Sequence, residues 1–205
     1  MITKLFISTL LLTLAFSSEA KVMKYKKIQE MAVDVLKENT FSLLTDSMED
    51  VGQFCPNYNN FDLEDKMNFF GHLVAQMAIY ESDNDPSTTF LESNGNISAG
   101  LLGISYGSIG SVYKSLGCDF LNAEDLKDPY KNLKCGFAII SRWTNQHGYL
   151  AFDDITGASV YWSTLREPYY TEIVLSNGNR KQVKVGKKFL IIDGLKNKFP
   201  ACFKK

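Results

Sequence analysis

The feature of this sequence that most constrains its fold is an apolar stripe that ends on a carboxylate. Apolar residues recur at intervals of three, four and three, at Met67, Phe70, Val74 and Met77. This spacing predicts one face of a helix that points into the core. Four residues further along the same face stands Glu81, and the breaker residues 82–86 predict that the helix ends there. The stripe therefore predicts a buried helix with an acid at its C-terminal end.

A carboxyl group in that position is a candidate for proton transfer. Burial disfavours the charged form, so the pKa of Glu81 should rise above its ordinary value. A carboxylic acid with a raised pKa at the floor of a cleft suits a general acid. The alternative is a glutamate that ends a helix and simply reaches solvent. The rest of the sequence decides between these two interpretations.

The N-terminal segment is typical of a secretory signal peptide. Lys4 precedes an apolar run from Leu5 to Phe16, which is too short to span a bilayer comfortably. Small residues at Ser18 and Ala20 stand where a signal peptidase reads, so we expect cleavage after residue 20. No other stretch of the sequence is apolar enough to cross a membrane. We expect a periplasmic or secreted protein whose residues 21–205 form one domain.

The charge balance argues against a nucleic-acid partner. The chain has 22 Lys and Arg residues against 23 Asp and Glu residues, whereas nucleic-acid binding usually needs a strongly basic surface. The run Asp83-Asn84-Asp85 lacks the spacing of an EF-hand calcium loop and is followed at once by Pro86. We expect neither a metal nor a cofactor, and a monomeric protein.

The cysteine pattern favours disulfides over a zinc site. None of the four cysteines, at positions 55, 118, 135 and 202, shows the paired short spacing of zinc ligands. In an exported chain the oxidising environment favours disulfide pairing. Three pairings are possible. We expect Cys118–Cys135, which closes a short loop, and Cys55–Cys202, which ties the early region to the C-terminus.

The hydrophobic pattern predicts a mostly helical domain with a small β element. Helices are expected over residues 24–38, 40–51, 62–82, 107–116, 128–146 and 153–165. Asp62 and the Asp128-Pro129 pair are expected to cap two of them. Residues 187–199 close the chain, and Gly194 leaves their local structure open. Residues 170–175 and 182–185 flank Asn177-Gly178, which is typical of a hairpin. Between Pro86 and Ser105 we expect irregular chain or short strands. The predicted class is α+β, predominantly α.

Four motifs occur in an order that resembles a known family. In chain order they are Glu81-Ser82, Ser98–Ile104, Asp128-Pro129 with Asn132–Gly136, and Ala158–Tyr161. Over residues 73–166 this order is similar to the soluble lytic transglycosylases and goose-type lysozymes. The resemblance implies a lysozyme-like fold with a substrate cleft. Residues 21–205 would then form a single lysozyme-like catalytic domain with Glu81 as its catalytic acid.

The chain departs from that family in the expected cleft. Leu102-Gly103 stands where the family carries a Met-Gln pair, and Trp162 replaces the Asn that follows the family's tyrosine. The loop after the acid also differs, and it contains Glu92. This possible second carboxylate could be a nucleophile, a stabiliser of positive charge on the sugar ring, or a partner for a substrate ammonium. The alternative is a solvated loop acid.

Several further residues are candidate substrate contacts. The resemblance implies that the second motif lines the cleft and that the tyrosine of the fourth motif reaches the acid. Nearby serines and an aromatic residue could hydrogen-bond to sugars or stack on them, although the serine after the acid could instead cap local backbone. The candidates are Ser82, Ser93, Ser98, Gly100, Leu101, Tyr106 and Tyr161.

Together these patterns predict a secreted peptidoglycan-cleaving glycosidase. It would be a lysozyme or lytic transglycosylase that acts on the β-1,4-linked MurNAc-GlcNAc backbone with Glu81 as general acid. Loss of the family's amide side chain together with Glu92 favours deacetylated glycan, in which glucosamine carries an ammonium. The expected partner is peptidoglycan or a related amino-sugar polymer. The alternative is a non-enzymatic glycan-binding or inhibitory protein on the same scaffold.

Overall fold

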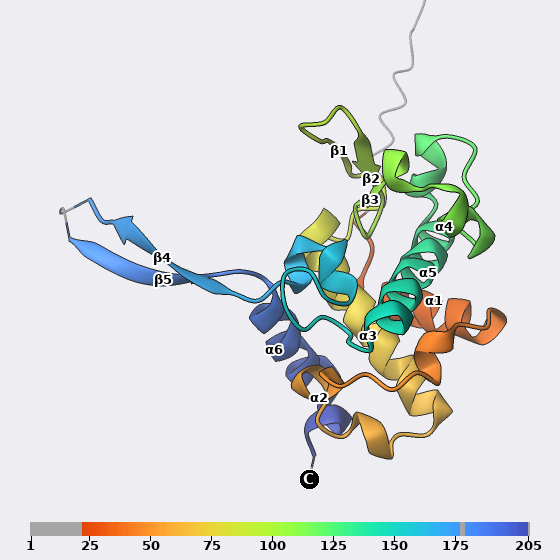
Figure 1. Ribbon diagram of the computed structural model, residues 1–205, viewed down its shortest axis with the longest axis horizontal. Coiled ribbons are helices and arrows are strands. Elements are labelled where there is room, and N and C mark those ends of the chain that lie inside the picture. Colours follow the sequence, from red (N-terminus) through yellow and green to blue (C-terminus); the bar gives the residue numbers. More distant parts are fainter. Residues whose placement is uncertain (1–21, 177–178, 205) are drawn as a thin grey trace, which may run out of the picture.

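The computed structural model describes residues 22–176 and 179–204 (Figure 1). The predicted signal peptide and the Asn177-Gly178 turn lie outside these residues. None of the described helices is both long enough and apolar enough to cross a membrane.

The fold is predominantly helical, with two small antiparallel β elements, so the predicted α+β class is confirmed. The α-helices are α1 (Tyr25–Glu38), α2 (Val51–Phe54), α3 (Leu63–Ser82), α4 (Ser111–Ser115), α5 (Pro129–His147) and α6 (Lys188–Lys198). Short 3-10 turns connect several of them, at Ser42–Leu44, Tyr58–Asn60, Tyr106–Ser108, Ala123–Lys127, Ala158–Val160, Ser163–Leu165 and Pro200–Phe203.

Helix α3 is the centre of the helical body, and α1 and α6 pack against it (Figure 1). The predicted stripe is buried, because Phe70, Val74 and Met77 are fully inaccessible to solvent and Met67 is nearly so. Burial of these side chains is the main stabilising term for a helix of this kind. The apolar stripe therefore fixes the helix that carries Glu81.

Two of the helices begin at the predicted caps. The carboxylate of Asp62 accepts a hydrogen bond from the Asp65 N–H at 2.9 Å, and that of Asp128 accepts one from the Lys131 N–H at 3.0 Å. Each bond satisfies a backbone donor that has no partner within its helix. The caps therefore set where α3 and α5 begin.

A three-stranded antiparallel sheet follows α3 in the chain. It consists of β1 (Thr89–Leu91), β2 (Ile97–Ala99) and β3 (Ile104–Ser105), with β2 in the middle. Phe90 pairs with Ser98, and Ser98 pairs in turn with Ser105. Residues 92–96 form the turn between β1 and β2, and residues 93–95 of this turn are exposed.

A second β element projects from the body as a long arm (Figure 1). Its strands β4 (Tyr169–Val174) and β5 (Arg180–Val185) pair antiparallel over six residues each, from Tyr169 opposite Val185 to Val174 opposite Arg180. The predicted hairpin is therefore confirmed, and it is longer than the sequence pattern indicated.

Both predicted disulfides are present, Cys55–Cys202 and Cys118–Cys135. The first joins the chain just after α2 to the 3-10 turn at the C-terminus. The second joins the segment after α4 to α5. Disulfides of this kind fit a protein that works outside the cytoplasm.

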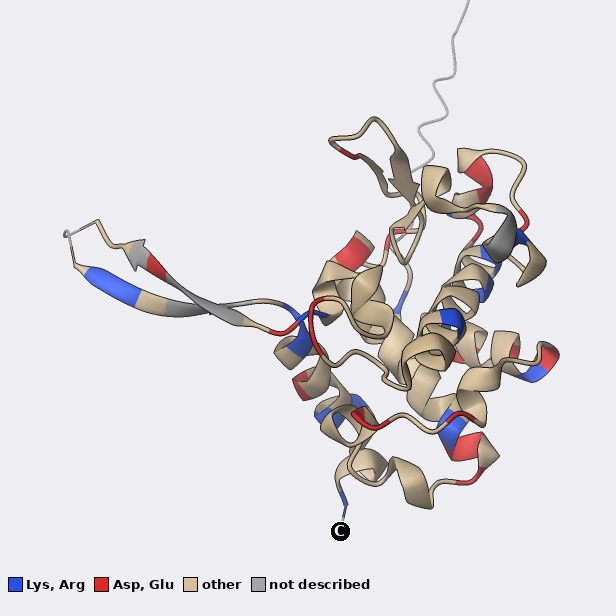
Figure 2. Ribbon diagram, in the orientation of Figure 1, with Lys and Arg blue, Asp and Glu red and all other residues tan. Residues whose placement is uncertain are grey.

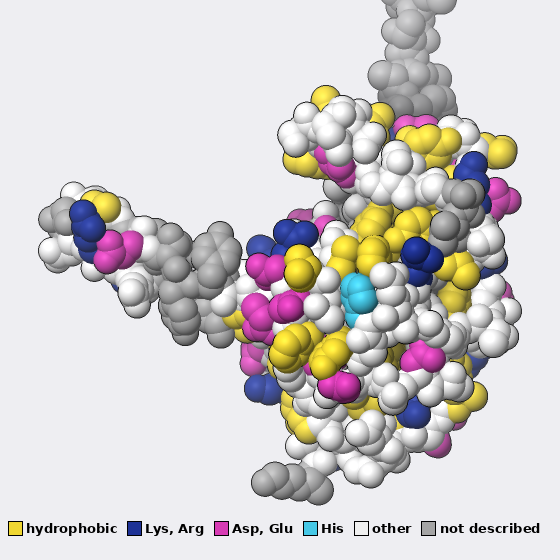
Figure 3. Space-filling model, viewed as in Figure 1, with side chains coloured by type: hydrophobic (Ala, Val, Ile, Leu, Met, Phe, Trp, Pro, Cys, Tyr) yellow, Lys and Arg dark blue, Asp and Glu magenta, His cyan; other side chains and the backbone are white. Residues whose placement is uncertain are grey.

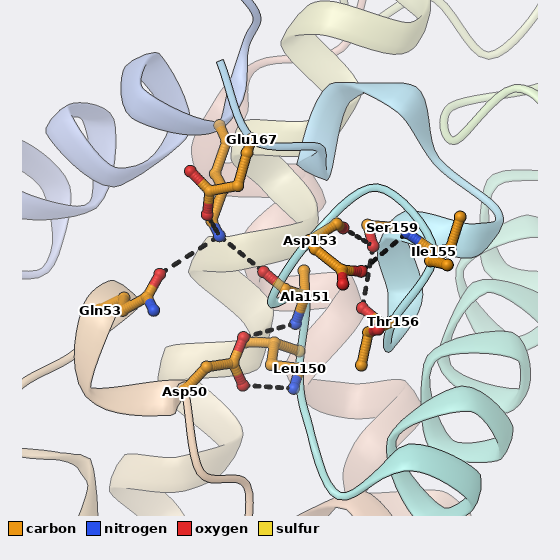
Figure 4. Close-up of polar contacts among 10 residues, drawn as sticks. Asp50, Gln53, Leu150, Ala151, Asp153, Ile155, Thr156, Ser159 and Glu167 are labelled. Atoms are coloured by element: carbon orange, nitrogen blue, oxygen red, sulfur yellow. Dashed lines mark hydrogen bonds and ion pairs between the residues drawn. The ribbon is translucent and has the colours of Figure 1, made fainter. Parts of the chain in front are cut away.

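Two predicted helices, over residues 40–51 and 153–165, are wrong. The first region is a 3-10 turn and irregular chain, because the Asp50 carboxylate accepts hydrogen bonds from the distant N–H groups of Leu150 and Ala151 (Figure 4). The second is two 3-10 turns. Asp153 accepts a bond from the Ile155 N–H at 2.8 Å, and such a local side-chain bond competes with helix formation.

Candidate active site

Glu81 lies in the last turn of α3, at the end of the buried stripe. Its carboxyl Oε1 accepts a hydrogen bond from the Thr164 hydroxyl at 2.5 Å. Thr164 is almost buried and belongs to the 3-10 turn Ser163–Leu165, which is 83 residues further along the chain. The contact therefore joins the end of α3 to the chain segment just before the arm.

Burial raises the pKa of Glu81, as its place on the stripe predicts. The Thr164 hydrogen bond and the positive charge of Lys187 act in the opposite direction, because both stabilise the carboxylate, but burial is the larger effect. The pKa shift favours the protonated form that a general acid needs at the start of its reaction.

The other carboxyl oxygen of Glu81 faces the backbone of Gly103. A Cβ atom at Gly103 would lie 3.1 Å from Oε2, and the residue has a φ of +55°. Glycine is the residue that adopts this conformation at little cost. Bare backbone therefore lies beside the acid at this position.

The loop that carries Gly103 is held by buried side chains. Asn132 on α5 accepts a hydrogen bond from the Leu102 N–H at 2.9 Å and donates to the Ala99 carbonyl at 3.1 Å. Trp162 donates its indole N–H to the Leu102 carbonyl at 2.8 Å. These bonds fix the loop on both sides of the residue that faces Glu81.

Tyr161 contacts the loop and is affected by the charges of both glutamates. Its hydroxyl oxygen accepts a hydrogen bond from the Ser105 N–H at 2.9 Å. Burial raises the pKa of Tyr161 strongly, and the charges of Glu92 and Glu81 contribute in the same direction. Both carboxylates are therefore within electrostatic range of one phenol.

Glu92 lies at the start of the turn between β1 and β2. Ser98 donates a short hydrogen bond to one carboxylate oxygen, and the Asn94 amide donates to the other at 3.3 Å. The Ser98 bond, with smaller contributions from Ser105 and Asn94, lowers the pKa of Glu92. The two glutamates thus have pKa values shifted in opposite directions, one toward the acid and one toward the carboxylate.

Three of the predicted contact residues form part of the scaffold. Ser82 is buried and donates to the carbonyl oxygens of Ala78 and Leu101, at 3.1 and 2.9 Å. Leu101 is fully buried, and a Cβ at Gly100 would meet the Leu126 carbonyl oxygen at 2.1 Å. These positions favour a role in holding the loop over direct contact with a ligand.

The other predicted contact residues are more accessible. Ser93 is exposed, and Tyr106 is exposed with its hydroxyl donating to the Leu121 carbonyl at 3.0 Å. Ser98 is mostly buried beneath Glu92. Thr164 and Lys187 were not predicted as site residues, because no local pattern marks two residues that reach Glu81 only through the tertiary fold.

Two surface cavities are lined by residues other than Glu81. One of about 790 Å³ is lined mainly by α5 and the segment before α2, including Phe41 and Arg142. The other, of about 420 Å³, is lined by Asp153–Ile155, Glu167 and Pro168. Figure 3 shows a notch between the lobe formed by β1 and β2 and the rest of the body. The candidate site is therefore identified by its side-chain chemistry and not by the size of a cavity.

The fold and the site define an α+β protein with two glutamates whose pKa values are shifted in opposite directions. No protein-family model and no curated protein sequence matches the chain. Among solved structures it is similar to the Bdellovibrio protein DslA (Bd0314), with a TM-score of 0.68 and 26% identity. The match covers 86% of this chain and 91% of that chain.

Two glutamate-to-glutamine variants of DslA match in the same way. Their TM-scores are 0.67 and 0.66 at 26% identity, and they cover 86% and 84% of this chain and 91% and 89% of theirs. The two glutamates substituted in those variants are eleven residues apart in the DslA sequence. Glu81 and Glu92 are also eleven residues apart.

Proposed function

We propose that this protein is a secreted glycosidase that cleaves the β-1,4-linked MurNAc-GlcNAc backbone of peptidoglycan, with Glu81 as general acid. The observation that carries the proposal is the contrast between Glu81, whose pKa is raised by burial, and Glu92, whose pKa is lowered by hydrogen bonds. Environments that push two carboxyl pKa values apart are typical of an acid paired with a carboxylate in glycoside cleavage.

In this mechanism Glu81 donates its proton to the glycosidic oxygen as the bond to the sugar carbon breaks. Positive charge develops on the sugar ring, and the Glu92 carboxylate stabilises that charge or acts as a nucleophile. Water then completes a hydrolytic reaction, whereas attack by the sugar's own 6-hydroxyl gives a 1,6-anhydro product. The Thr164 hydroxyl on Oε1 leaves Oε2 of Glu81 as the oxygen that carries the proton.

The similarity to DslA supports this proposal. Glutamine variants were solved for two DslA glutamates with the same separation as Glu81 and Glu92. We infer that these pairs correspond, and that the enzyme acts outside the cytoplasm as a monomer. The two disulfides agree with that location.

Replacing Glu81 with glutamine tests the general acid. E81Q keeps the size and hydrogen-bonding capacity of the side chain but removes the proton donor, so wall digestion should fall by a factor of about 100 or more. Glu64→Gln, at an exposed position in the first turn of the same helix, is the matched control and should retain activity. Turbidity clearing of purified walls is the measurement, with circular dichroism to check folding.

The products of wall digestion distinguish a lysozyme, a lytic transglycosylase and a glycan-binding protein. Mass spectrometry of soluble products distinguishes a reducing-end sugar, the product of a lysozyme, from the 1,6-anhydro ring of a lytic transglycosylase. A folded E81Q variant that still clears walls would rule out Glu81 as the acid. Wild-type protein that binds walls and releases no fragments would instead support a glycan-binding or inhibitory protein.

Glu92 is proposed to favour deacetylated glycan. Its lowered pKa favours the ionised carboxylate, which would attract the ammonium of glucosamine. Gly103 presents no side chain where the resembled family has an amide expected to contact sugar. Glu92→Gln should therefore reduce turnover of deacetylated walls more than turnover of acetylated walls. Equal losses on both walls would leave Glu92 with a role in the chemical step alone. Equal wild-type rates on acetylated and deacetylated walls would contradict the proposed preference for deacetylated glycan.

A further inference from the structure

The arm formed by β4 and β5 is exposed along the part whose side chains are described. Its strands pack chiefly against each other, and Figure 1 shows them extending away from the body. Near the tip Val174 is 70% exposed. A two-stranded hairpin without further packing is only marginally stable in water. An arm of this length therefore contributes little to the core of the protein that carries it.

Both ends of the arm are connected to segments that act on the candidate catalytic acid. The chain passes through Thr164, which donates to Glu81, before it enters β4. It leaves β5 and reaches Lys187, whose charge acts on Glu81, two residues later. The two chain segments that enter and leave the arm therefore both act on Glu81.

The base of the arm is held firmly. The ammonium of Lys188, at the start of α6, forms a short ion pair with Glu167 just before β4 and donates to the Ala151 carbonyl at 2.6 Å. Figure 4 shows Glu167, Gln53 and Ala151 converging on this buried amine. A Cβ at Gly186 would lie 2.9 Å from the Cα of Pro168, so the two ends touch. The arm therefore has a fixed origin on the body.

The charge on the arm is basic although the whole chain is not. Residues 169–185 contain three basic residues and one acid, whereas the chain has a net charge of −1. Arg180 and Lys181 are exposed, and Arg180 pairs with the acid, Glu172, at 3.0 Å. Figure 2 shows this basic segment at the outer end of β5. Two of the three basic residues of the arm, Arg180 and Lys181, thus lie toward its outer end.

We propose that the β4–β5 arm is an accessory binding element for the carboxylate-bearing wall polymer that carries the scissile strand. This inference rests on the proposed function, because the peptide substituents of peptidoglycan supply the carboxylates. Arg180 and Lys181 attract these groups, while the fixed base aligns the bound polymer with Glu81. The arm thus increases the local concentration of wall material at the site without contacting the bond that breaks.

Co-sedimentation with insoluble peptidoglycan tests the arm directly. The assay uses the full chain with E81Q, so that the wall is not digested during the measurement. Adding Arg180→Gln and Lys181→Gln should weaken wall binding about tenfold at low ionic strength and flatten its salt dependence. The matched control, Lys27→Gln with Lys37→Gln, removes the same charge from exposed positions on α1 and should bind as before.

A second variant separates electrostatic attraction from an effect on the arm's own folding. Glu172→Gln breaks the cross-strand ion pair but makes the arm more positive. If the arm binds carboxylates, this variant should bind walls more tightly than the parent. If Arg180 only supports the hairpin, the variant should bind more weakly or unchanged, and the proposal fails.

Cleavage of a short soluble glycan keeps this inference separate from the proposed function. The variant that carries Arg180→Gln and Lys181→Gln but keeps Glu81 should cleave such a fragment within about twofold of the wild-type rate. A short ligand does not reach the arm, so the lost charges should not affect it. No cleavage by wild type would contradict the proposed function and leave the binding result standing. Wall binding unaffected by the arm variants, or an arm-dependent dimer in sedimentation, would overturn the inference.

Discussion

At the scale of single residues, the candidate site depends on how one carboxyl group is surrounded. Burial at the end of α3 favours the protonated form of Glu81, and the Thr164 hydrogen bond moderates that effect. Without Thr164 the carboxylate would lose a donor in a partly dry environment, where hydrogen bonds to a charged group are strong. The threonine hydroxyl therefore partly offsets the larger effect of burial on the pKa of Glu81.

Thr164→Val should shift the pH dependence of cleavage. The hydrogen bond stabilises the ionised form of Glu81, so its removal raises the pKa of Glu81 further. A general acid is active while protonated, so activity is lost as pH rises through its pKa. The alkaline limb of the kcat/KM profile should therefore move to higher pH. Thr164→Ser keeps the hydroxyl and should retain the wild-type profile, and an unshifted limb in Thr164→Val would contradict the assignment.

At the scale of elements, a buried network joins parts of the chain that are distant in sequence. Lys188 is 2% exposed and is bonded to α2 through Gln53, to the loop after α5 through Ala151, and to Glu167. Its ammonium is satisfied by three oxygen atoms, which is the condition under which a buried charge is tolerated. The network fixes the segment that supplies Thr164.

Lys188→Met should destabilise the protein because it leaves these partners without a donor. We expect a loss of about 2–4 kcal/mol in the free energy of unfolding, since breaking a buried pair strands its polar partners. Lys196 is exposed on the same helix, so Lys196→Met is the control. It should change the free energy of unfolding by less than about 0.5 kcal/mol. Urea titration measures both variants. Equal stability of the two would show that the network is not a structural anchor.

The elements that depend on local sequence could be predicted, whereas those that depend on distant contacts could not. Helix α3 and its cap follow from local spacing, and so do the direction of the pKa shift of Glu81 and the β4–β5 hairpin. The segment near Asp50 was wrongly predicted as helix, because its carboxylate bonds to backbone 100 residues away. Thr164 was missed for the same physical reason. Interactions between segments distant in sequence leave no local periodicity to detect.

At the scale of the whole molecule, two disulfides constrain the unfolded chain to different degrees. Cys118–Cys135 spans 17 residues and Cys55–Cys202 spans 147. Loop-closure entropy grows with the logarithm of the span, which gives about 3 kcal/mol for the short bridge and about 5 kcal/mol for the long one. The long bridge also joins the early helices to the C-terminus, so it holds the largest part of the fold together.

Removing each bridge by paired serine substitutions should show this order. Cys55→Ser with Cys202→Ser should lower the free energy of unfolding by more than Cys118→Ser with Cys135→Ser does, by about 2 kcal/mol on the entropic model. Denaturant titration of both variants under the same conditions gives the comparison. A larger loss for the short bridge would show that packing around Cys118 outweighs chain entropy.

The long bridge also turns most of the chain into a covalent ring, and the β4–β5 arm lies within that ring. A protease that cuts the exposed arm would therefore produce two fragments that stay linked to each other. The helical body would remain assembled, and the cut would appear only after reduction of the disulfide. In surroundings rich in proteases, the exposed arm can therefore be cut while the disulfide keeps the two fragments together.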